Sequence, residues 1–185
     1  MQKKCNMKKF IILAVIICAV LLIAACSGGK DKDAKVPGVT TFTNDMESTG
    51  WINQYTLSKE IAHSGKFSSR IDSIMQYSFG FSEFFKNISD TLPEQVNIDL
   101  WLLYPQTGIN STLVVSIDSI GKSIFWTGQE LKDSVKTANQ WKEVKTSFTL
   151  PVNIMPTDKI SIYVWNKDKK AFYIDDMKVS FGKKK

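Results

Sequence analysis

Few side chains in this chain of 185 residues could act as catalytic nucleophiles or bases. The only histidine is His63, and an imidazole base needs both a nucleophile and an orienting group beside it. The sequence contains no Gly-x-Ser-x-Gly elbow, no glycine-rich phosphate loop and no His-x-x-x-His pair. Asp and Glu are scattered without an evident pair. We therefore expect a protein without enzymatic activity, with a two-carboxylate glycoside hydrolase as an alternative.

The three cysteines, Cys5, Cys18 and Cys26, all lie in an N-terminal segment with the layout of a signal peptide. Four lysines in the first nine residues precede an apolar run at 10–25, which is shorter than the about 20 residues that span a membrane. The run ends Leu-Ile-Ala-Ala-Cys and resembles the bacterial lipobox. This resemblance implies that residues 1–25 are removed and that Cys26 receives diacylglyceryl, so no thiol is left for a disulfide, a metal site or a nucleophile.

The segment after Cys26 is polar and charged, and residues 26–35 are predicted to be a flexible tether. Each buried acyl methylene contributes about 0.8 kcal/mol, so two or three chains would anchor a soluble domain durably. We expect an exported protein that lipid holds on a bacterial membrane. Ser27, in place of Asp, is compatible with sorting to the outer membrane, and the outer membrane or cell surface is the expected location.

The net charge of +6 does not indicate nucleic-acid binding, because it comes from the ends of the chain. Residues 36–182 contain 14 basic and 16 acidic side chains, and the basic tail at 183–185 adds three lysines. A domain this close to neutrality lacks the basic footprint of a protein that binds DNA or RNA. Its length of about 150 residues is sufficient for one domain with its own hydrophobic core.

Short runs rich in β-branched and aromatic residues, separated by Gly, Pro, Asn, Asp and Ser about every ten residues, predict an all-β sandwich or barrel. Alternation places Ile160, Ile162 and Val164 on one face of a strand, with Tyr163 and Trp165 on the other. The best candidate for a short helix or a long loop is 129–138. The predicted strands are 66–74, 77–85, 96–104, 112–118, 123–127, 143–150, 159–166 and 172–181, with less distinct ones at 40–42 and 52–57.

Four segments in order resemble the galactose-binding-like jelly rolls, a superfamily that includes many carbohydrate-binding modules of polysaccharide-degrading enzymes. They are Asp45-Met46-Glu47 with Gly50-Trp51, the stretch 62–68 around Ser64-Gly65-Lys66, Trp141-Lys142-Glu143-Val144 with 148–151, and 172–177 around Asp175-Asp176. The resemblance implies that residues 36–182 form a jelly-roll β-sandwich that binds carbohydrate.

Asp175 and Asp176 are adjacent in an otherwise apolar last strand, so alternation predicts that one of them points towards the interior. A carboxylate there is costly unless a cation or several donors meet it. In the resembled superfamily a structural Ca2+ meets it. Calcium takes six to eight oxygen ligands, and the alternative is that backbone donors or Arg70 satisfy Asp175. The calcium ligands implied here are Glu47, the Lys66 carbonyl and Asp175, with Asp45 or Asp176 as helpers.

Aromatic side chains beyond the needs of the core could bind sugar rings, whose C–H groups meet the negative face of an aromatic ring. We assign Trp51 and Trp141 to packing. The function predicted is non-catalytic glycan binding, and the alternatives are burial of these rings in the core and a structural or adhesion role with a partner in the cell envelope. The glycan-binding residues predicted are Trp101, Trp126, Tyr163 and Trp165, with Asn97, Asp99 and Asn166 as hydrogen-bonding partners.

Overall fold

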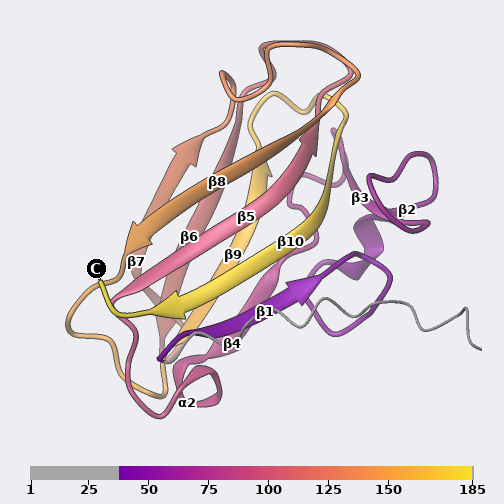
Figure 1. The fold of residues 1–185 in the computed structure, drawn as a ribbon. Helices are drawn as coiled ribbons and strands as arrows, with labels where there is room; N and C mark the ends of the chain where they lie inside the picture. The colour runs from indigo at the N-terminus through magenta and orange to yellow at the C-terminus, as the bar shows by residue number, and fades with distance from the viewer. Residues whose placement is uncertain (1–37, 185) are drawn as a thin grey trace, which may run out of the picture. The chain divides into compact units, whose positions relative to one another are not determined.

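The computed structural model describes residues 38–184, and the predicted signal peptide, Cys26 and tether lie outside the described residues. Two antiparallel sheets pack face to face around one core (Figure 1), which confirms the all-β jelly-roll sandwich. The compact unit begins at Val36, and every strand and core residue that the structure describes lies in it. The described strands and core residues therefore all fall within residues 36–185.

The larger sheet has six strands in the order β2-β3-β10-β5-β8, with β1 also paired to β10. The smaller sheet has four strands in the order β4-β9-β6-β7. The strands of the larger sheet are β1 (Thr40–Asn44), β2 (Leu57–Ser58), β3 (Ser68–Ile71), β5 (Gln95–Leu103), β8 (Trp141–Thr149) and β10 (Phe172–Gly182). Those of the smaller sheet are β4 (Phe81–Phe84), β6 (Ser111–Ser119), β7 (Lys122–Glu130) and β9 (Lys159–Asn166).

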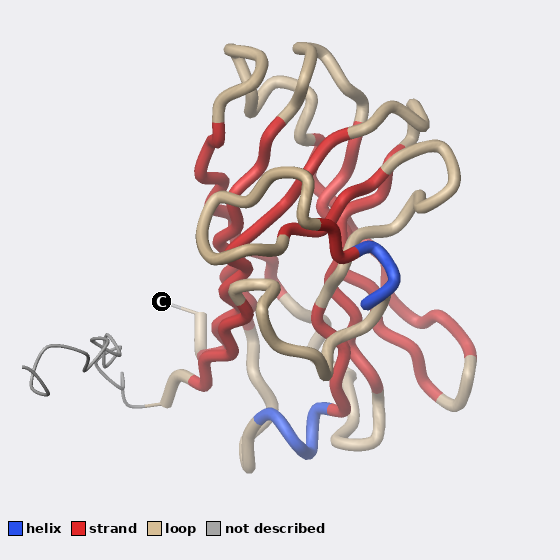
Figure 2. The backbone as a smooth tube through the Cα atoms, turned by 90° about the vertical axis from the view of Figure 1, so that its right-hand side faces the viewer, coloured by secondary structure: helices blue, strands red, loops and turns tan. Residues whose placement is uncertain are grey.

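Among the described residues, helical structure is limited to two single turns, η1 (Gln54–Thr56) and α2 (Phe85–Ile88), which Figure 2 shows in blue among the strands and loops. Within residues 38–184, no helix has the length and apolar character needed to cross a membrane. The helix considered at 129–138 is absent, because Gln129 and Glu130 continue β7 and the residues after them form a loop with turns.

The core consists of the alternate side chains that each sheet directs at the other. The inward face predicted for 159–166 is confirmed, because its inward side chains are fully buried in the core, where those of β6 meet them. These side chains are Leu113, Val115 and Ile117 of β6, and Ile160, Ile162 and Val164 of β9.

Strand β10 holds the N-terminal part of the fold to the larger sheet. Its first residues pair with β3 and its later residues with β1, and the register with β5 shifts between Asp175 and Lys178. Asp176 has a φ of 46°, so the bulge inserts one residue in a left-handed conformation at this point. Asp175 pairs with Trp101 on the outer face, where a loop buries it, so the prediction that one acid points into the core was wrong.

We expect Gly80→Ala to destabilise the fold by about 2 to 3 kcal/mol, because a Cβ at residue 80 would overlap the carbonyl oxygen of Ile162 in the neighbouring strand. The matched control is Gly108→Ala, at a φ of 76° with no atom within 4 Å of the added carbon. It should cost only about 1 kcal/mol. Urea unfolding of both variants measures the difference, and equal losses would contradict the tight contact between residue 80 and β9.

Candidate functional site

Four aromatic side chains lie on the outer face of the smaller sheet, which we call the aromatic face: Tyr77, Trp126, Tyr163 and Trp165. Pairing across β6 sets their order, since Trp165 lies opposite Thr112, Tyr163 opposite Val114 and Trp126 opposite Ser116. Trp126 is 53% exposed and Tyr77 is 45% exposed, while the other two rings are half-buried. The face therefore offers a set of rings whose surfaces solvent can reach.

Tyr77 is a residue of the aromatic face that alternation did not predict, and a change of register explains why. Tyr77 pairs with Trp165, whereas Phe81 pairs with Ile162, so the two strands slip by one residue between these pairs. Simple alternation puts Tyr77 on the same face as Phe81, which is in the core. The slip instead turns Tyr77 outwards with Trp165. No local sequence pattern marks this slip, apart from Gly80 within it.

One glycine, Gly128, gives the aromatic face its room. Gly128 lies opposite Val114, in the same row as Tyr163, and has no side chain to fill the space beside it. A Cβ at residue 128 would lie 2.5 Å from Cγ2 of Thr112 and 3.5 Å from Cη2 of Trp126. The Trp126 ring thus lies along its own strand over Gly128.

The rings are held by one another and by polar neighbours. Tyr77 and Tyr163 meet edge to face, with centroids 5.6 Å apart. Burial raises the pKa of the Tyr163 hydroxyl, while hydrogen bonds with the side chains of Ser116 and Trp126 act in the opposite direction. Tyr163 therefore lies in a defined position between Tyr77 and β6.

Polar and charged groups lie beside the rings. Lys167 Nζ lies 5.5 Å from the centroid of the Trp165 ring and forms an ion pair with Glu130, whose carboxylate also accepts a hydrogen bond from Thr112. At the other side, the hydroxyls of Ser82 and Ser161 share a hydrogen bond of 2.8 Å. These groups can exchange hydrogen bonds with hydroxyls of a ligand that stacks on the rings.

Three of the seven predicted glycan-binding residues, Trp126, Tyr163 and Trp165, lie together on the aromatic face. Asn97, Asp99 and Trp101 point outwards from β5, which belongs to the larger sheet on the opposite side of the sandwich. The seven residues therefore do not form one surface. Alternation distinguishes inward from outward residues, but it does not reveal which sheet a strand joins.

Asn166 is also misplaced in the prediction, since it is fully buried. Its amide group donates to the carbonyl oxygens of Asp72, at 3.1 Å, and Lys170, at 2.9 Å. It shares the inward face of β9 with Val164, as strict alternation requires. Asn166 fixes two loops and is not accessible to a glycan.

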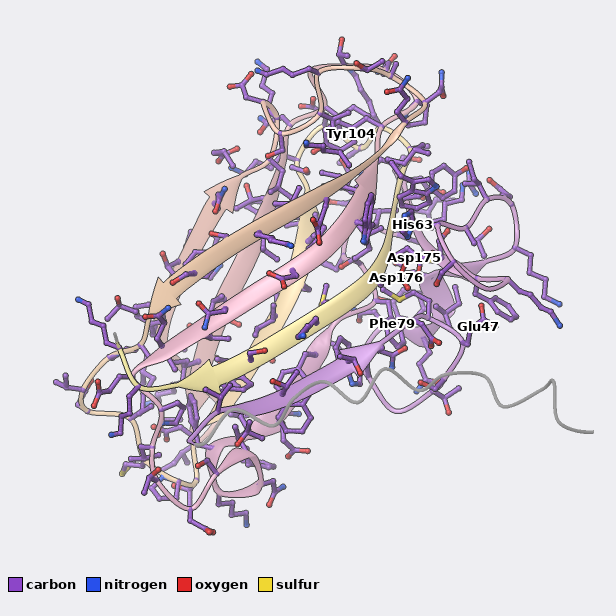
Figure 3. The ribbon with its side chains drawn as sticks, viewed as in Figure 1. Glu47, His63, Phe79, Tyr104, Asp175 and Asp176 are labelled. Carbon is purple, nitrogen blue, oxygen red and sulfur yellow. The ribbon has the colours of Figure 1, made fainter. Side chains whose placement is uncertain are left out.

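Trp101 belongs to a second cluster, on the outer face of the larger sheet. The His63 ring stacks on it at 3.7 Å between centroids and meets Trp141 edge-on at 5.6 Å. His63 Nδ1 is 2.5 Å from Oδ2 of Asp176. Figure 3 shows His63, Asp175 and Asp176 together beside β10. His63 thus attaches the 59–66 loop to the sheet through contacts with two tryptophans and a carboxylate.

The carboxylates implied as calcium ligands meet backbone donors from the same loop. Glu47 Oε1 accepts from the amides of Lys66, at 2.5 Å, and Phe67, at 2.8 Å. Asp175 Oδ2 accepts from the amide of His63 at 2.7 Å. Within residues 38–184, no three His, Cys, Asp or Glu side chains converge as a metal shell requires. As arranged, these residues do not fit a calcium ion, because N–H groups meet the oxygens that would bind it, and calcium binding stays a prediction.

Solved structures of carbohydrate-binding modules have a similar fold. The CBM22-2 xylan-binding domain from Paenibacillus barcinonensis Xyn10C matches with a TM-score of 0.53 and 16% identity, over 76% of this chain and 98% of that one. The CBM22-1 xylan-binding domain of the same protein has a TM-score of 0.49 and 14% identity, over 78% and 95% of the two chains. No protein-family model and no curated protein matches the chain. The likeness establishes the class of fold, a carbohydrate-binding-module-like β-sandwich.

We expect the stability of the fold to depend on pH through Asp175. Burial raises the pKa of this carboxyl to about 6 from 3.8, against the hydrogen bonds from His63 and Asp176. Because the folded state binds this proton more tightly, protonation stabilises it, and this contribution is lost as pH rises from 4 through 6. Relative to Asp175→Asn, the wild type should gain up to about 3 kcal/mol between pH 7 and pH 4, at about 1.4 kcal/mol per pKa unit.

Urea unfolding in the presence of a calcium chelator measures this difference at each pH. A wild type that loses stability relative to Asp175→Asn on acidification would show that the carboxylate is stabilised in its ionised form. Added calcium that stabilises the wild type at pH 7, but not Asp175→Asn, would instead support the calcium site.

Proposed function

We propose that this chain is a lipid-anchored, non-catalytic glycan-binding module, and that the aromatic face is its binding surface. The observation that carries the proposal is the gathering of Tyr77, Trp126, Tyr163 and Trp165 on one face with accessible ring surfaces. Side chains that serve only the core would point between the sheets, but these four point away from it. Exposed aromatic rings are costly to solvate and are typical of surfaces that bind a ligand.

The chemistry of the face suits a carbohydrate. Sugar rings present C–H groups that pack on aromatic faces and hydroxyls that need polar partners. Serine hydroxyls at Ser82, Ser116 and Ser161 and the charged pair of Glu130 and Lys167 lie beside the rings. The likeness in fold to a domain described as xylan-binding makes xylan the first polysaccharide to test.

A hydrolase is not supported by this face. The acids near it are Glu130, which is paired with Lys167 and Thr112, and Asp118, which lies opposite Lys159 at the other end of the sheet. Glycoside hydrolysis needs two carboxylates about 5 to 10 Å apart across one bond. Asp118 pairs with Lys159 at the start of β9, whereas Glu130 pairs with Thr112 near the start of β6. The two acids therefore lie at opposite ends of the sheet and do not flank one glycosidic bond.

We expect Trp126→Ala to weaken glycan binding about tenfold or more, because it removes the most exposed ring of the aromatic face. The matched control is Trp101→Ala, which removes the same side chain from the opposite sheet and should leave affinity unchanged. Affinity electrophoresis and calorimetry with xylan and a panel of other polysaccharides measure both variants, with unfolding curves to verify the fold. The proposal fails if no glycan binds, or if Trp101→Ala weakens binding as much as Trp126→Ala.

The lipid anchor is tested separately. When the full chain is expressed in a bacterium, the mature protein should begin at Cys26 and carry two or three acyl chains, and it should sediment with membranes. Mass spectrometry of the N-terminal peptide identifies the modification. Cys26→Ala should abolish it and prevent normal processing. An unmodified Cys26 in the membrane-bound wild type would contradict the lipoprotein assignment without affecting the glycan proposal.

A further inference from the structure

The described chain enters and leaves the sandwich at the same end, which we call the tether end. Thr40, near the first described residue, pairs with Phe181, near the last, and both lie where β10 finishes (Figure 1). The turn between β6 and β7, the loop between β8 and β9 and the turn α2 are at this end too, because Phe84 and Asp118 both pair with Lys159 at the start of β9. Any anchor on the N-terminal segment therefore acts on the tether end.

Apolar side chains stand at the tips of these loops. Ile120, in the β6–β7 turn, is 95% exposed, and Val152, in the β8–β9 loop, is 101% exposed, the two highest values among the exposed large hydrophobic residues described. Phe84 and Met155 are exposed in part at the same end. The Phe84 ring has Lys86 Nζ and Lys159 Nζ each 5.7 Å from its centroid. Loop tips normally carry polar residues, so the nearly complete exposure of Ile120 and Val152 is unusual.

Ile120 is exposed at a conformational cost. It has a φ of 49° and is followed by Gly121 at 74°, which is the pair of left-handed conformations of a two-residue hairpin turn. Asn, Asp or Gly are preferred at the first position, and a β-branched residue there is an outlier. The sequence therefore places a large apolar side chain at a turn where both solvent and backbone disfavour it. An external apolar partner would provide a reason.

The surface beside the β8–β9 loop is partly apolar and bordered by lysines. A shallow groove of about 440 Å³ is lined by Leu150, Pro151 and Ile154, with Lys183 and Lys184 beside it. Lys183 pairs with Glu94 at 3.0 Å. The five described lysines of this end are Lys86, Lys122, Lys159, Lys183 and Lys184, and the five acids are Glu83, Asp90, Glu94, Asp118 and the buried Asp158. This mixture of apolar tips and near-balanced charge suits a phospholipid headgroup region more than a strongly charged polymer.

We propose that the tether end is a membrane-docking surface, in which Ile120 and Val152 enter the headgroup region of the bilayer to which the chain is anchored. The lysines around them contact lipid phosphates. The inference rests on the lipid anchor of the proposed function. The 11 residues between Cys26 and Gly38 span at most about 40 Å, so the anchor keeps the tether end within reach of the lipid.

The experiment uses residues 36–185, which contain no cysteine, with an N-terminal hexahistidine segment bound to vesicles that contain nickel-chelating lipid. This artificial anchor replaces lipid on Cys26, so the result does not depend on natural lipidation. Ile120→Cys and Val152→Cys each carry a polarity-sensitive fluorophore, and the vesicles are phosphatidylcholine with about 30% phosphatidylglycerol. For both positions we expect a shift of emission to shorter wavelength and a rise of about twofold or more in intensity.

The control is Ile74→Cys, which is 81% exposed but lies beyond β3, whose last residue pairs with the start of β10 at the opposite end. Its fluorophore should remain in water. The proposal is overturned if labels at 120 and 152 respond no more than the label at 74. It is also overturned if they become shielded without vesicles as protein concentration rises, because a second copy of the chain would then be the partner.

These variants leave the aromatic face intact, so glycan binding can be measured on the same samples. Membrane insertion without glycan binding would refute the glycan proposal and retain the docking surface. Glycan binding without membrane insertion would refute the docking surface and retain the glycan proposal.

Discussion

Alternation along the central strands of the smaller sheet is the constraint on which the rest of the molecule depends. Ile160, Ile162 and Val164 must point inwards to complete the core, so Tyr163 and Trp165 between them have only the outer face to occupy. The same rule applied to β6 brings Val114 and Ser116 beneath these rings, and both are buried although they point away from the core. The aromatic rings thus form a thin layer over the outer face of the smaller sheet, and this layer is open to solvent.

A second constraint holds the N-terminal part of the fold in place. The bulge at Asp176 interrupts β10 where its partner changes from β3 to β1, and the loop at 59–66 covers the gap. Backbone amides of that loop meet the carboxylates of Glu47 and Asp175. The raised pKa of Asp175 is the consequence, since burial disfavours its charge more than these amides favour it. In this arrangement backbone amides donate hydrogen bonds to the carboxylate oxygens of Glu47 and Asp175. These are the oxygens for which the resemblance implies a calcium ion.

The bounds and faces of strands could be predicted from the sequence, because they depend on local periodicity. The grouping of residues on one sheet could not, because it depends on which strands pair. The strand at 159–166 was predicted with its observed bounds and faces, because three aliphatic residues alternate with one serine and two aromatic residues along it. The grouping of Trp101 with Trp126 was wrong, because nothing local to β5 or β7 indicates that they belong to different sheets. Tyr77 was missed because a one-residue slip against β9 reverses its face. The error at Asn166 has another cause. The alternation that places Val164 inwards also places Asn166 inwards, so its burial could have been predicted from the sequence.

The geometry of β6 and β7 relates the two proposed surfaces. Ile120 lies in the turn that joins these strands, and Trp126 follows six residues later on β7, which at about 3.3 Å per residue places it some 20 Å along the strand. Trp165 lies farther from the tether end, because it pairs with Thr112 and Thr112 pairs with Glu130 at the end of β7. If the tether end rests on a bilayer, the aromatic face stands on the side of the sandwich and extends away from the lipid. A polymer outside the membrane could then reach the rings without displacing the domain from its anchor.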